Sequence, residues 1–414
     1  MSRIVFLLLC AYHLCFIGAA RAQSPEEYGV TTMTPPALTL DPGPKYWPRF
    51  RMWQGIPSIE RTAKGRLWAT WYCGPLIEGQ NGDSNYAVLV TSTDDGKTWS
   101  RPVAVYDATT FFGGSMLDPH LWIDPQGRMW WFVNRALHVN DKNGYLSVWG
   151  FCTENPDSAK PKWIAPVFAG YGSALNKPTV LSNGDWLRPV DSFDKNDPER
   201  TKFYVSRDQG KSFSFLTKTP IKDGSFSEHM IVERKDGSLF ALSRALYGIS
   251  QIESFDHGAT WKNDKPFTKE RGVNARFHLR RLKSGALLLV LNDDPKTRTN
   301  MTAMLSEDEG KTWPYKLLLD DRALVTYPDG TEGSNGLLYI IYDHGRYTKG
   351  EQEILFAKIT EADIKAGKLV NKDSRLRQLI NRLADDGGGV HVTQEMRKIQ
   401  AEYDKSVGKV KPKK

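Results

Sequence analysis

Cysteine is scarce in this sequence, with 4 residues in a chain of 414. Cys10 and Cys15 belong to the apolar start of the chain, which leaves Cys73 and Cys152 for the rest. Two cysteines cannot build the disulfide framework of a small secreted domain, and their spacing matches no zinc-binding pattern. One disulfide bridge and two buried free thiols are both compatible with the sequence.

Long apolar runs are equally rare, and the one that exists is N-terminal. Residues 1–22 have the order of a secretory signal peptide, with Arg3, an apolar run from Ile4 to Ile17 and the small-x-small site Ala20-Arg21-Ala22. The run is barely long enough to span a membrane and contains His13, so cleavage is favoured over retention as an anchor. We therefore expect a secreted or periplasmic protein without stable membrane insertion.

Motifs for nucleotides, redox chemistry and metals are missing as well, so the sequence predicts no cofactor and leaves only a structural calcium ion open. The net charge of +8 does not indicate a nucleic-acid partner, because residues 371–414 alone hold 11 Lys and Arg against 6 Asp and Glu. The rest of the chain is nearly balanced and has neither a helix-turn-helix motif nor a basic stripe interleaved with aromatics. We expect a monomer that binds no nucleic acid.

One short repeat is abundant. It reads Ser-x-Asp-x-Gly-x-Thr/Ser-Trp/Phe and begins at Ser92, Ser206, Ser254 and Ser306. In each copy the Ser and Asp side chains can bond turn backbone groups, the Gly can take a positive φ, and the final aromatic can pack between neighbouring sheets. Each copy follows an apolar segment, so the repeat predicts the turn of a β-hairpin.

The copies are spaced like the blades of a propeller. The last three begin 48 and 52 residues apart, and the 114 residues between the first two leave room for a decayed unit at residues 147–163. A sixth unit runs from about Leu324 to Ile359. Units of four short strands at this period predict an all-β, six-bladed β-propeller. The expected signal peptide, N-terminal extension, propeller and helical or disordered basic tail occupy residues 1–22, 23–45, 46–368 and 369–414.

These repeats resemble the Asp-box, or bacterial neuraminidase repeat, and the region from about Trp53 to Ile364 is similar to the sialidase superfamily. Because such repeats are structural and propellers host many activities, the repeats alone assign no function. The superfamily places its functional residues, a Glu, three arginines, a Tyr and an Asp, around the central axis.

Four positions match the sialidase pattern in order and spacing. Glu228, in Ser227-Glu228-His229, corresponds to the catalytic Glu of the family. Arg244 and Arg298 correspond to its second and third arginines. Tyr327, in Thr326-Tyr327-Pro328, falls where the family keeps its nucleophilic Tyr. The resemblance implies that these residues form an active site.

The resemblance also implies a chemistry. A phenol with a pKa of about 10 is a poor nucleophile at neutral pH, so a neighbouring Glu must accept its proton as it attacks the anomeric carbon. A neutral phenol suits a substrate with a carboxylate at the reacting carbon, because a carboxylate nucleophile would be repelled there. The arginines would hold that anion through charge-assisted hydrogen bonds.

The sequence departs from the family at the first arginine. The family opens blade one with Arg-Ile-Pro, whereas this chain has Gly55-Ile56-Pro57. A further family arginine is also replaced, with Glu78 near its place. One lost positive charge and one added negative charge weaken a site for a sialic-acid carboxylate. The candidates for compensation are Arg49, Arg51 and Arg61.

The family's acid/base residue is an Asp in the loop before the first repeat. Asp83 is the nearest match, and Glu78 is a substitute that we also expect to contact substrate. Either carboxyl group would protonate a leaving oxygen if a dry pocket raised its pKa. The alternative is a solvated carboxylate that caps a turn.

Polar residues open three other blades, where inner strands line the central channel. The sequences are Asp118-Pro-His120, Asn176-Lys177 and Arg276-Phe-His278. We expect His120, Asn176, Lys177, Arg276 and His278 to contact the substrate. For the two histidines an acid/base role is weighed against that of a hydrogen-bonded structural residue.

Three functions compete on this sequence. The first is a secreted exo-acting retaining glycoside hydrolase that removes a terminal acidic sugar, sialic acid or an analogue, with Tyr327 as nucleophile and Glu228 as its base. The second is a lyase or hydrolase that acts on a uronate-containing glycan through Tyr327 or a histidine. The third is a non-catalytic carbohydrate-binding propeller, whose signature would be the loss of both the Tyr and the Glu. Because both remain, the third function has little support. The first function is our prediction, and the second stays its alternative, which the missing first arginine and the presence of His120 and His278 favour.

Overall fold

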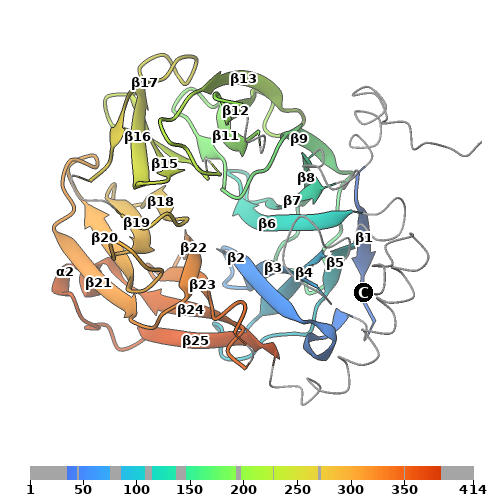
Figure 1. The fold of residues 1–414 in the computed structure, drawn as a ribbon. Coiled ribbons are helices and arrows are strands. Elements are labelled where there is room, and N and C mark those ends of the chain that lie inside the picture. The colour runs from blue at the N-terminus through green and yellow to red at the C-terminus, as the bar shows by residue number, and fades with distance from the viewer. Residues whose placement is uncertain are drawn as a thin grey trace, which may run out of the picture.

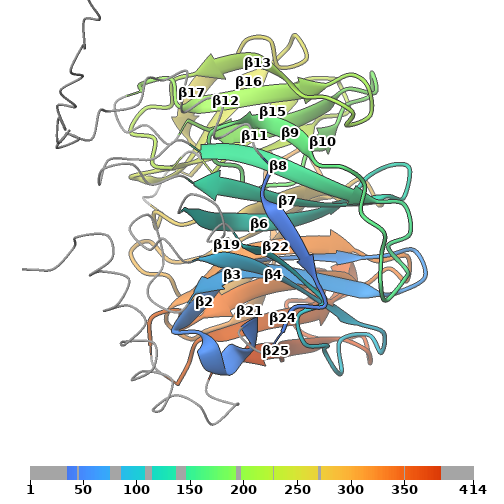
Figure 2. The same ribbon diagram turned by 90° about the vertical axis from the view of Figure 1, so that its right-hand side faces the viewer.

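The computed structural model describes residues 35–43, 46–74, 85–107, 114–136, 146–192, 197–226, 228–268, 272–348 and 350–383. Within them the chain forms six antiparallel sheets, five with four strands and one with five. Figure 1 shows the sheets arranged as blades around a central axis, and Figure 2 shows the same ring from its side. The prediction of an all-β, six-bladed propeller is confirmed.

The first three blades follow one another along the chain, and their strands run in order from the axis outward. Blade one consists of β2 (Trp53–Arg61), β3 (Leu67–Gly74), β4 (Tyr86–Ser92) and β5 (Ala104–Asp107), with β1 (Ala37–Leu40) added at the outer edge. Blade two consists of β6 (Ser115–Ile123), β7 (Met129–Ala136), β8 (Leu146–Thr153) and β9 (Val167–Tyr171). Blade three consists of β10 (Thr179–Val180), β11 (Trp186–Asp191), β12 (Thr201–Ser206) and β13 (Ser214–Thr219).

The last three blades repeat this order. Blade four consists of β14 (Met230–Glu233), β15 (Leu239–Ala245), β16 (Gly248–Ser254) and β17 (Lys262–Pro266). Blade five consists of β18 (His278–Arg281), β19 (Leu287–Asn292), β20 (Met301–Ser306) and β21 (Tyr315–Asp320). Blade six consists of β22 (Val325–Glu332), β23 (Leu338–His344), β24 (Glu353–Ile359) and β25 (Arg375–Arg382). The described helices are the 3-10 turn η2 (Pro48–Phe50) and α2 (Glu361–Ala366).

The four sequence repeats form the turn between the third and fourth strands of blades one, three, four and five. In every copy the Ser hydroxyl donates to the Asp carboxylate at 2.8 Å and accepts the N–H of the Gly. The Gly residues have φ between 83° and 88°, which suits their lack of a side chain. In blade two, Thr153 and Asn155 make the corresponding bond at 2.8 Å, so the decayed unit keeps the turn.

The aromatic residue that ends each repeat packs against the preceding blade. Trp99 of blade one meets Phe356 of blade six edge to face, with ring centroids 6.0 Å apart. Trp261 of blade four stacks on Phe203 of blade three at 4.3 Å. This packing between neighbouring sheets is what the repeat predicts, and it buries large aromatic surfaces between the blades.

The ring closes between blades one and six through side chains rather than a shared strand. Ser58 of β2 donates to Asp329 of β22 at 2.5 Å, and the N–H of Ile56 donates to Asp343 of β23 at 2.7 Å. Both carboxylates are buried. The start of β2 is therefore fixed to two strands of blade six.

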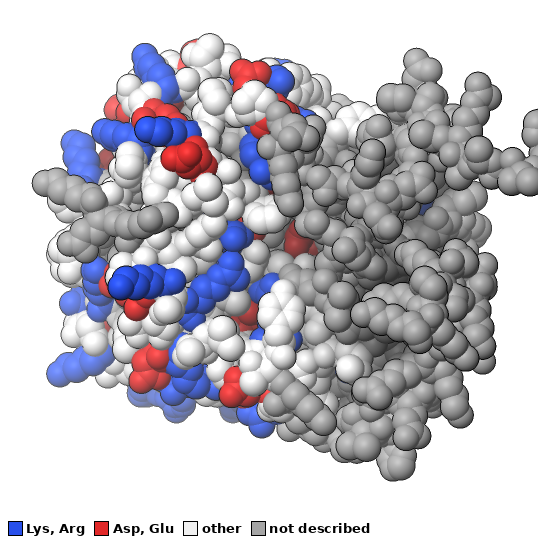
Figure 3. Space-filling model, in the orientation of Figure 1, with Lys and Arg blue, Asp and Glu red and all other residues white. Residues whose placement is uncertain are grey.

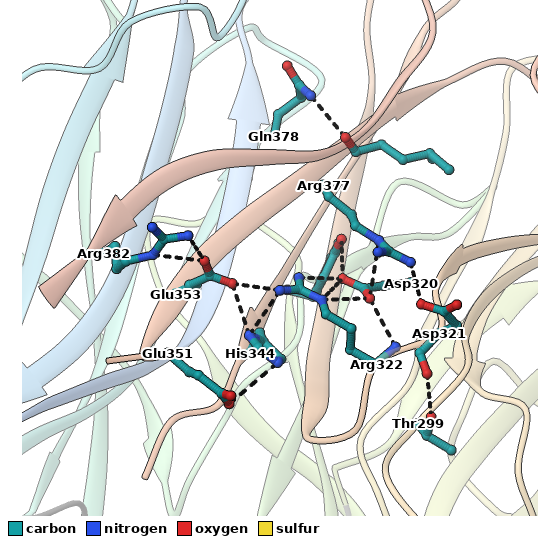
Figure 4. Close-up of polar contacts among 12 residues, drawn as sticks. Thr299, Asp320, Asp321, Arg322, His344, Glu351, Glu353, Arg377, Gln378 and Arg382 are labelled. Carbon is teal, nitrogen blue, oxygen red and sulfur yellow. Dashed lines mark hydrogen bonds and ion pairs between the residues drawn. The ribbon is translucent and has the colours of Figure 1, made fainter. Parts of the chain in front are cut away.

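The end of the propeller lies later than we expected. The sequence predicts a helical or disordered tail from residue 369, but β25 is the outermost strand of blade six and pairs with β24. Figure 4 shows how charged groups hold it: Arg382 pairs with Glu353, and Arg377 with Asp320 and Asp321. The strand is rich in arginine, which hid its alternation of exposed and half-buried residues. The helix α2 precedes Gly367, and its capping box includes Thr360 and Asp363.

Cys73 and Cys152 are buried free thiols, so the structure contains no bridge between them. Within the described ranges, no helix is long and apolar enough to cross a membrane. In that same part of the chain, no group of three or more His, Cys, Asp or Glu side chains is placed to hold a metal ion. The signal-peptide prediction for residues 1–22 falls outside the described residues.

Candidate active site

Three inner strands share a backbone distortion near their start. Ile56 of β2, Asp118 of β6 and Tyr327 of β22 each precede a proline and have positive φ values of 56°, 47° and 55°. The strand register shifts at the same place in all three. Such backbone costs about 1–3 kcal/mol for a residue with a side chain and persists only where surrounding contacts fix it. The bulge in β22 sets the direction of the Tyr327 side chain.

Tyr327 meets Glu228 and Arg244 in a compact, buried group. The Tyr327 hydroxyl donates to Glu228 Oε1 at 3.0 Å, and Arg244 Nη1 donates to the same carboxylate oxygen at 2.9 Å. Arg244 Nη1 also lies 3.3 Å from the phenol oxygen. The other carboxylate oxygen, Glu228 Oε2, has no hydrogen-bond partner among the described residues. The three residues come from blades six and four, so the ring fold brings together what the sequence separates.

Burial and charge set the protonation of this group. Burial raises the pKa of Tyr327 above its ordinary value, and the Glu228 carboxylate raises it further, while Arg244, Arg346 and Arg298 act in the opposite direction. Burial alone would lower the pKa of Arg244, but Glu228 and Tyr327 outweigh it and raise that pKa. The phenol is therefore neutral at physiological pH, and it lies in contact with a carboxylate that can accept its proton.

Arg298 also lies near the Tyr327 ring. Its guanidinium carbon is 5.6 Å from the ring centroid, and its Nη2 donates to the backbone oxygen of Asn274 at 3.3 Å. The Asn274 side chain accepts a hydrogen bond from Arg244 Nε at 2.5 Å. Asn274 thus links the two arginines that the sequence singled out, although no motif had marked it.

A third arginine, Arg346, also approaches Tyr327, and no pattern in the sequence had indicated it. The guanidinium carbon of Arg346 lies 4.5 Å from the Tyr327 ring centroid. Arg346 follows β23 and forms an ion pair with Asp343 at 2.7 Å. Arg51 and Arg61, which the sequence offered as replacements for the lost first arginine, have other partners. Arg51 binds the backbone oxygen of Tyr46, and Arg61 pairs with Asp95 at 3.7 Å.

Asn176 and Arg276 contact the backbone of the site. Arg276 is buried and donates to the carbonyl of Pro328 at 2.9 Å and to Asn176 Oδ1 at 2.7 Å. Asn176 in turn donates to the carbonyl of Glu228 at 3.1 Å. These contacts hold the segments that carry Tyr327 and Glu228, so both side chains position the pair. The expectation that they contact substrate has no support in this placement.

Lys177 and His278 belong to the same buried network. Lys177 Nζ binds Glu60 at 2.8 Å and Asp329 at 3.1 Å, and all three side chains are at most 4% exposed. His278 Nδ1 lies 3.2 Å from Asp329. Burial raises the pKa of Asp329, but Lys177 and His278 overcome this and hold it well below its usual range. The network fixes β22 to the neighbouring blades.

His120 has the structural role that we weighed against catalysis. It is fully buried, its Nδ1 lies 3.2 Å from the Asp118 carbonyl, and its Nε2 lies 2.7 Å from Arg188 Nη2. Because a guanidinium only donates, Nε2 is the acceptor and Nδ1 carries the proton. Burial and Arg188 hold the pKa of His120 well below its ordinary value, so the ring is neutral.

Two expected residues cannot be placed. Asp83 and Glu78 lie within residues 75–84, outside the described residues. The side chain of Arg49 is also outside the described set. The assignment of the acid/base residue therefore stays a prediction.

The outer surface offers a separate groove. It has a volume of about 960 Å³, runs between blades four and five, and is lined by Phe267, Trp313 and charged residues of both signs. It does not include Tyr327 or Glu228. Figure 3 shows that Lys and Arg side chains also gather near the propeller axis on the face turned to the viewer.

The sequence from residue 112 to residue 340 matches the model of a protein family described as the BNR repeat-like domain. The match covers more than half of the chain. The chain belongs to this family, within the sialidase and BNR-repeat superfamily. No curated protein sequence matches this BNR repeat-like protein.

Solved structures share the fold of this BNR repeat-like protein at low sequence identity. The Hadza microbial sialidase Hz136 is 20% identical over 71% of this chain, with a TM-score of 0.58, and the match spans 64% of that chain. The NanB sialidase of Streptococcus pneumoniae is 12% identical over 83% of this chain and 73% of its own, with a TM-score of 0.59. An α-L-arabinanase of Penicillium chrysogenum is 12% identical over 80% of this chain and 100% of its own, with a TM-score of 0.54. At these sequence identities the likeness shows a shared fold alone.

Proposed function

We propose that this protein is an exo-acting retaining glycoside hydrolase that removes a terminal acidic sugar, sialic acid or an analogue, from glycoconjugates. The observation that carries the proposal is the 3.0 Å hydrogen bond between the Tyr327 hydroxyl and Glu228. Arg244, Arg298 and Arg346 surround this pair and supply positive charge for an anionic substrate. As part of the proposal, residues 1–22 are removed and the enzyme acts outside the cytoplasm.

The proposed reaction proceeds in two steps. First, the Tyr327 oxygen attacks the anomeric carbon, the phenol proton passes to Glu228, and the bond to the leaving oxygen breaks as an acid protonates it. Asp83 or Glu78 is the expected acid. Then water attacks the anomeric carbon and gives its proton to the residue that served as the acid, Tyr327 leaves as a phenolate, and Glu228 returns its proton to the phenolate. Two displacements at one carbon retain its configuration.

The proposed pair satisfies the requirements of this chemistry. The raised pKa of Tyr327 keeps the phenol neutral until the reaction, which avoids repulsion between the nucleophile and a substrate carboxylate. The shared hydrogen bond from Arg244 holds Glu228 in position beside the phenol. The alternative with a histidine base finds no support, because His120 is bonded between Arg188 and the Asp118 carbonyl, and His278 lies against Asp329.

A panel of fluorogenic substrates tests the proposal. Purified protein is assayed on a sialoside, on several uronides and on neutral glycosides, beside Tyr327→Phe and Glu228→Gln. We expect cleavage of an acidic glycoside, with losses of about 10²–10⁴-fold in kcat in each variant, because each lacks one partner of the proton transfer. Cleavage that persists in Tyr327→Phe would contradict the proposal, as would activity on neutral glycosides alone.

A further inference from the structure

Gly55 stands where the resemblance places an arginine, and the structure shows what fills the space beside it. A Cβ atom built on Gly55 would lie 2.4 Å from Arg346 Nε, 2.9 Å from Arg346 Cδ and 2.8 Å from Asp343 Oδ2. Contacts below about 3.4 Å are too close for carbon atoms that are not bonded. Arg346 therefore occupies the volume that a side chain on Gly55 would need.

The position of Arg346 is fixed by the fold. Its Nη2 binds Asp343 Oδ2 at 2.7 Å, and the same oxygen accepts the N–H of Ile56 at 2.7 Å. The Asp343 side chain is fully buried, and that of Arg346 is 5% exposed. One carboxylate thus ties the guanidinium of blade six to the bulge of blade one, next to Gly55.

The loop that carries Arg346 is anchored at both ends. His344, at the end of β23, lies 2.9 Å from Glu353 at the start of β24. Arg322 donates to Glu353 at 2.9 Å, and Arg382 of β25 binds its other oxygen, as Figure 4 shows. Because several charged groups share this network, it fixes the ends of the loop. The Arg346 guanidinium is therefore held in place before any substrate arrives.

Three guanidinium groups from three blades therefore surround the Tyr327 ring. Arg244 is 3.3 Å from the phenol oxygen, and the Arg346 and Arg298 carbons are 4.5 Å and 5.6 Å from the ring centroid. Two carboxylates, Glu228 and Asp343, form ion pairs with members of this group. Three positive charges against two negative charges leave one excess positive charge beside the nucleophile.

We infer that Arg346, supplied by blade six, binds an anionic substrate group together with Arg244 and Arg298 and so replaces the missing first arginine. Gly55 is the residue that makes room for it. The inference rests on the proposed function and adds to it the residue that selects an anionic sugar. A substrate carboxylate on the reacting carbon, bound beside Tyr327, contacts the guanidinium of Arg346, which blade six supplies. The loss of the arginine in blade one is thus compensated by an arginine that no family position marks.

Arg346→Met tests this inference on whichever fluorogenic acidic glycoside, sialoside or uronide, the wild-type protein cleaves. The comparison substrate is its carboxamide, which lacks the negative charge. We expect KM for the acid to rise about tenfold to a hundredfold, because a charge-assisted contact is lost, while KM for the carboxamide stays unchanged. Arg61→Met, at the far end of β2 from Gly55, is the matched control and leaves both values unchanged.

The relation between positions 55 and 346 supplies a second test. Gly55→Ala is expected to reproduce the Arg346→Met pattern, because its methyl group displaces the guanidinium. The double variant Gly55→Arg/Arg346→Gly is expected to recover at least about tenfold in KM for the acid, since the charge returns from blade one. Failure of the double variant to recover any affinity for the acid would count against the shared position.

The outcomes separate this inference from the function on which it rests. A wild-type protein that cleaves no acidic glycoside contradicts the proposed function and the inference with it. Wild-type cleavage with equal KM changes for acid and carboxamide in Arg346→Met, or with no change in either, overturns the role of Arg346 alone.

Discussion

At the residue scale, Lys177 is a buried charge that is paired and hydrogen-bonded inside the protein. Its ammonium group lies between Glu60 and Asp329, at 2.8 Å and 3.1 Å, and also donates to two backbone carbonyls. A charge removed from water is tolerated only when it is paired and hydrogen-bonded in this way. Every donor of the ammonium group is therefore used inside the protein, which leaves none for a substrate.

Replacement of Lys177 by Met is expected to destabilise the protein strongly. The change leaves two carboxylates buried without their cation, which typically costs about 3–5 kcal/mol. Urea unfolding monitored by Trp fluorescence measures the loss. Lys316→Met, which breaks an exposed pair with Asp293, is the control and should cost less than about 1 kcal/mol. A stable Lys177→Met protein with a raised KM would instead make Lys177 a substrate contact.

The sequence and the fold contribute differently to the site. Tyr327, Glu228, Arg244 and Arg298 were predictable because their order and spacing match a known pattern, and they do lie together. Arg346 was not predictable, because it lies in a loop without a motif and reaches Tyr327 only through ring closure.

At the scale of the element, β25 shows how an edge strand can escape detection. The blades with Ser-x-Asp-x-Gly repeats were predictable from their turns, whereas blade six has α2 and residues 367–374 between its third and fourth strands. The sequence of β25 carries three arginines, which suggested a solvated tail. Two of them are instead ion-paired, Arg382 to Glu353 and Arg377 to Asp320 and Asp321, and Ile380 of the same strand is buried.

Truncation distinguishes the two placements of the propeller's end. A chain that ends at Leu383 keeps every strand of blade six, and we expect it to fold with an unchanged Tm. A chain that ends at Gly367 lacks β25, exposes the edge of β24 and leaves Glu353 without Arg382. We expect that shorter chain to aggregate or to lose at least about 10 °C in Tm, measured by differential scanning fluorimetry. Equal stability of both chains would restore the earlier boundary at residue 368.

At the scale of the whole molecule, the propeller buries many tyrosines between its blades. Burial raises the pKa values of Tyr86, Tyr106 and Tyr342 well above the ordinary value. Burial also raises the pKa of Tyr339 to about 12. The six-fold arrangement was predictable from the repeat spacing, but which aromatic hydroxyls it buries was not, because that depends on contacts between blades.

These tyrosines predict a loss of stability in alkali. A phenol whose pKa is raised by folding stabilises the native state fully below the pKa of the unfolded chain, about 10, and loses that contribution as pH rises through the folded value. We therefore expect Tm to be constant near neutrality and to fall steeply above about pH 10. Absorbance at 295 nm should show that only part of the 16 tyrosines titrate before unfolding. Titration of all of them near pH 10 in a still folded protein would contradict the burial.

The covalent intermediate provides the most direct test of the central claim that Tyr327 is the nucleophile. Protein incubated with a fluorinated, activated form of the acidic sugar that it cleaves is denatured, digested and mapped by mass spectrometry. The account predicts one added glycosyl group on the peptide that contains Tyr327, and none in Tyr327→Phe. A glycosyl group on any other residue, or turnover of the reagent without a covalent adduct, would contradict it.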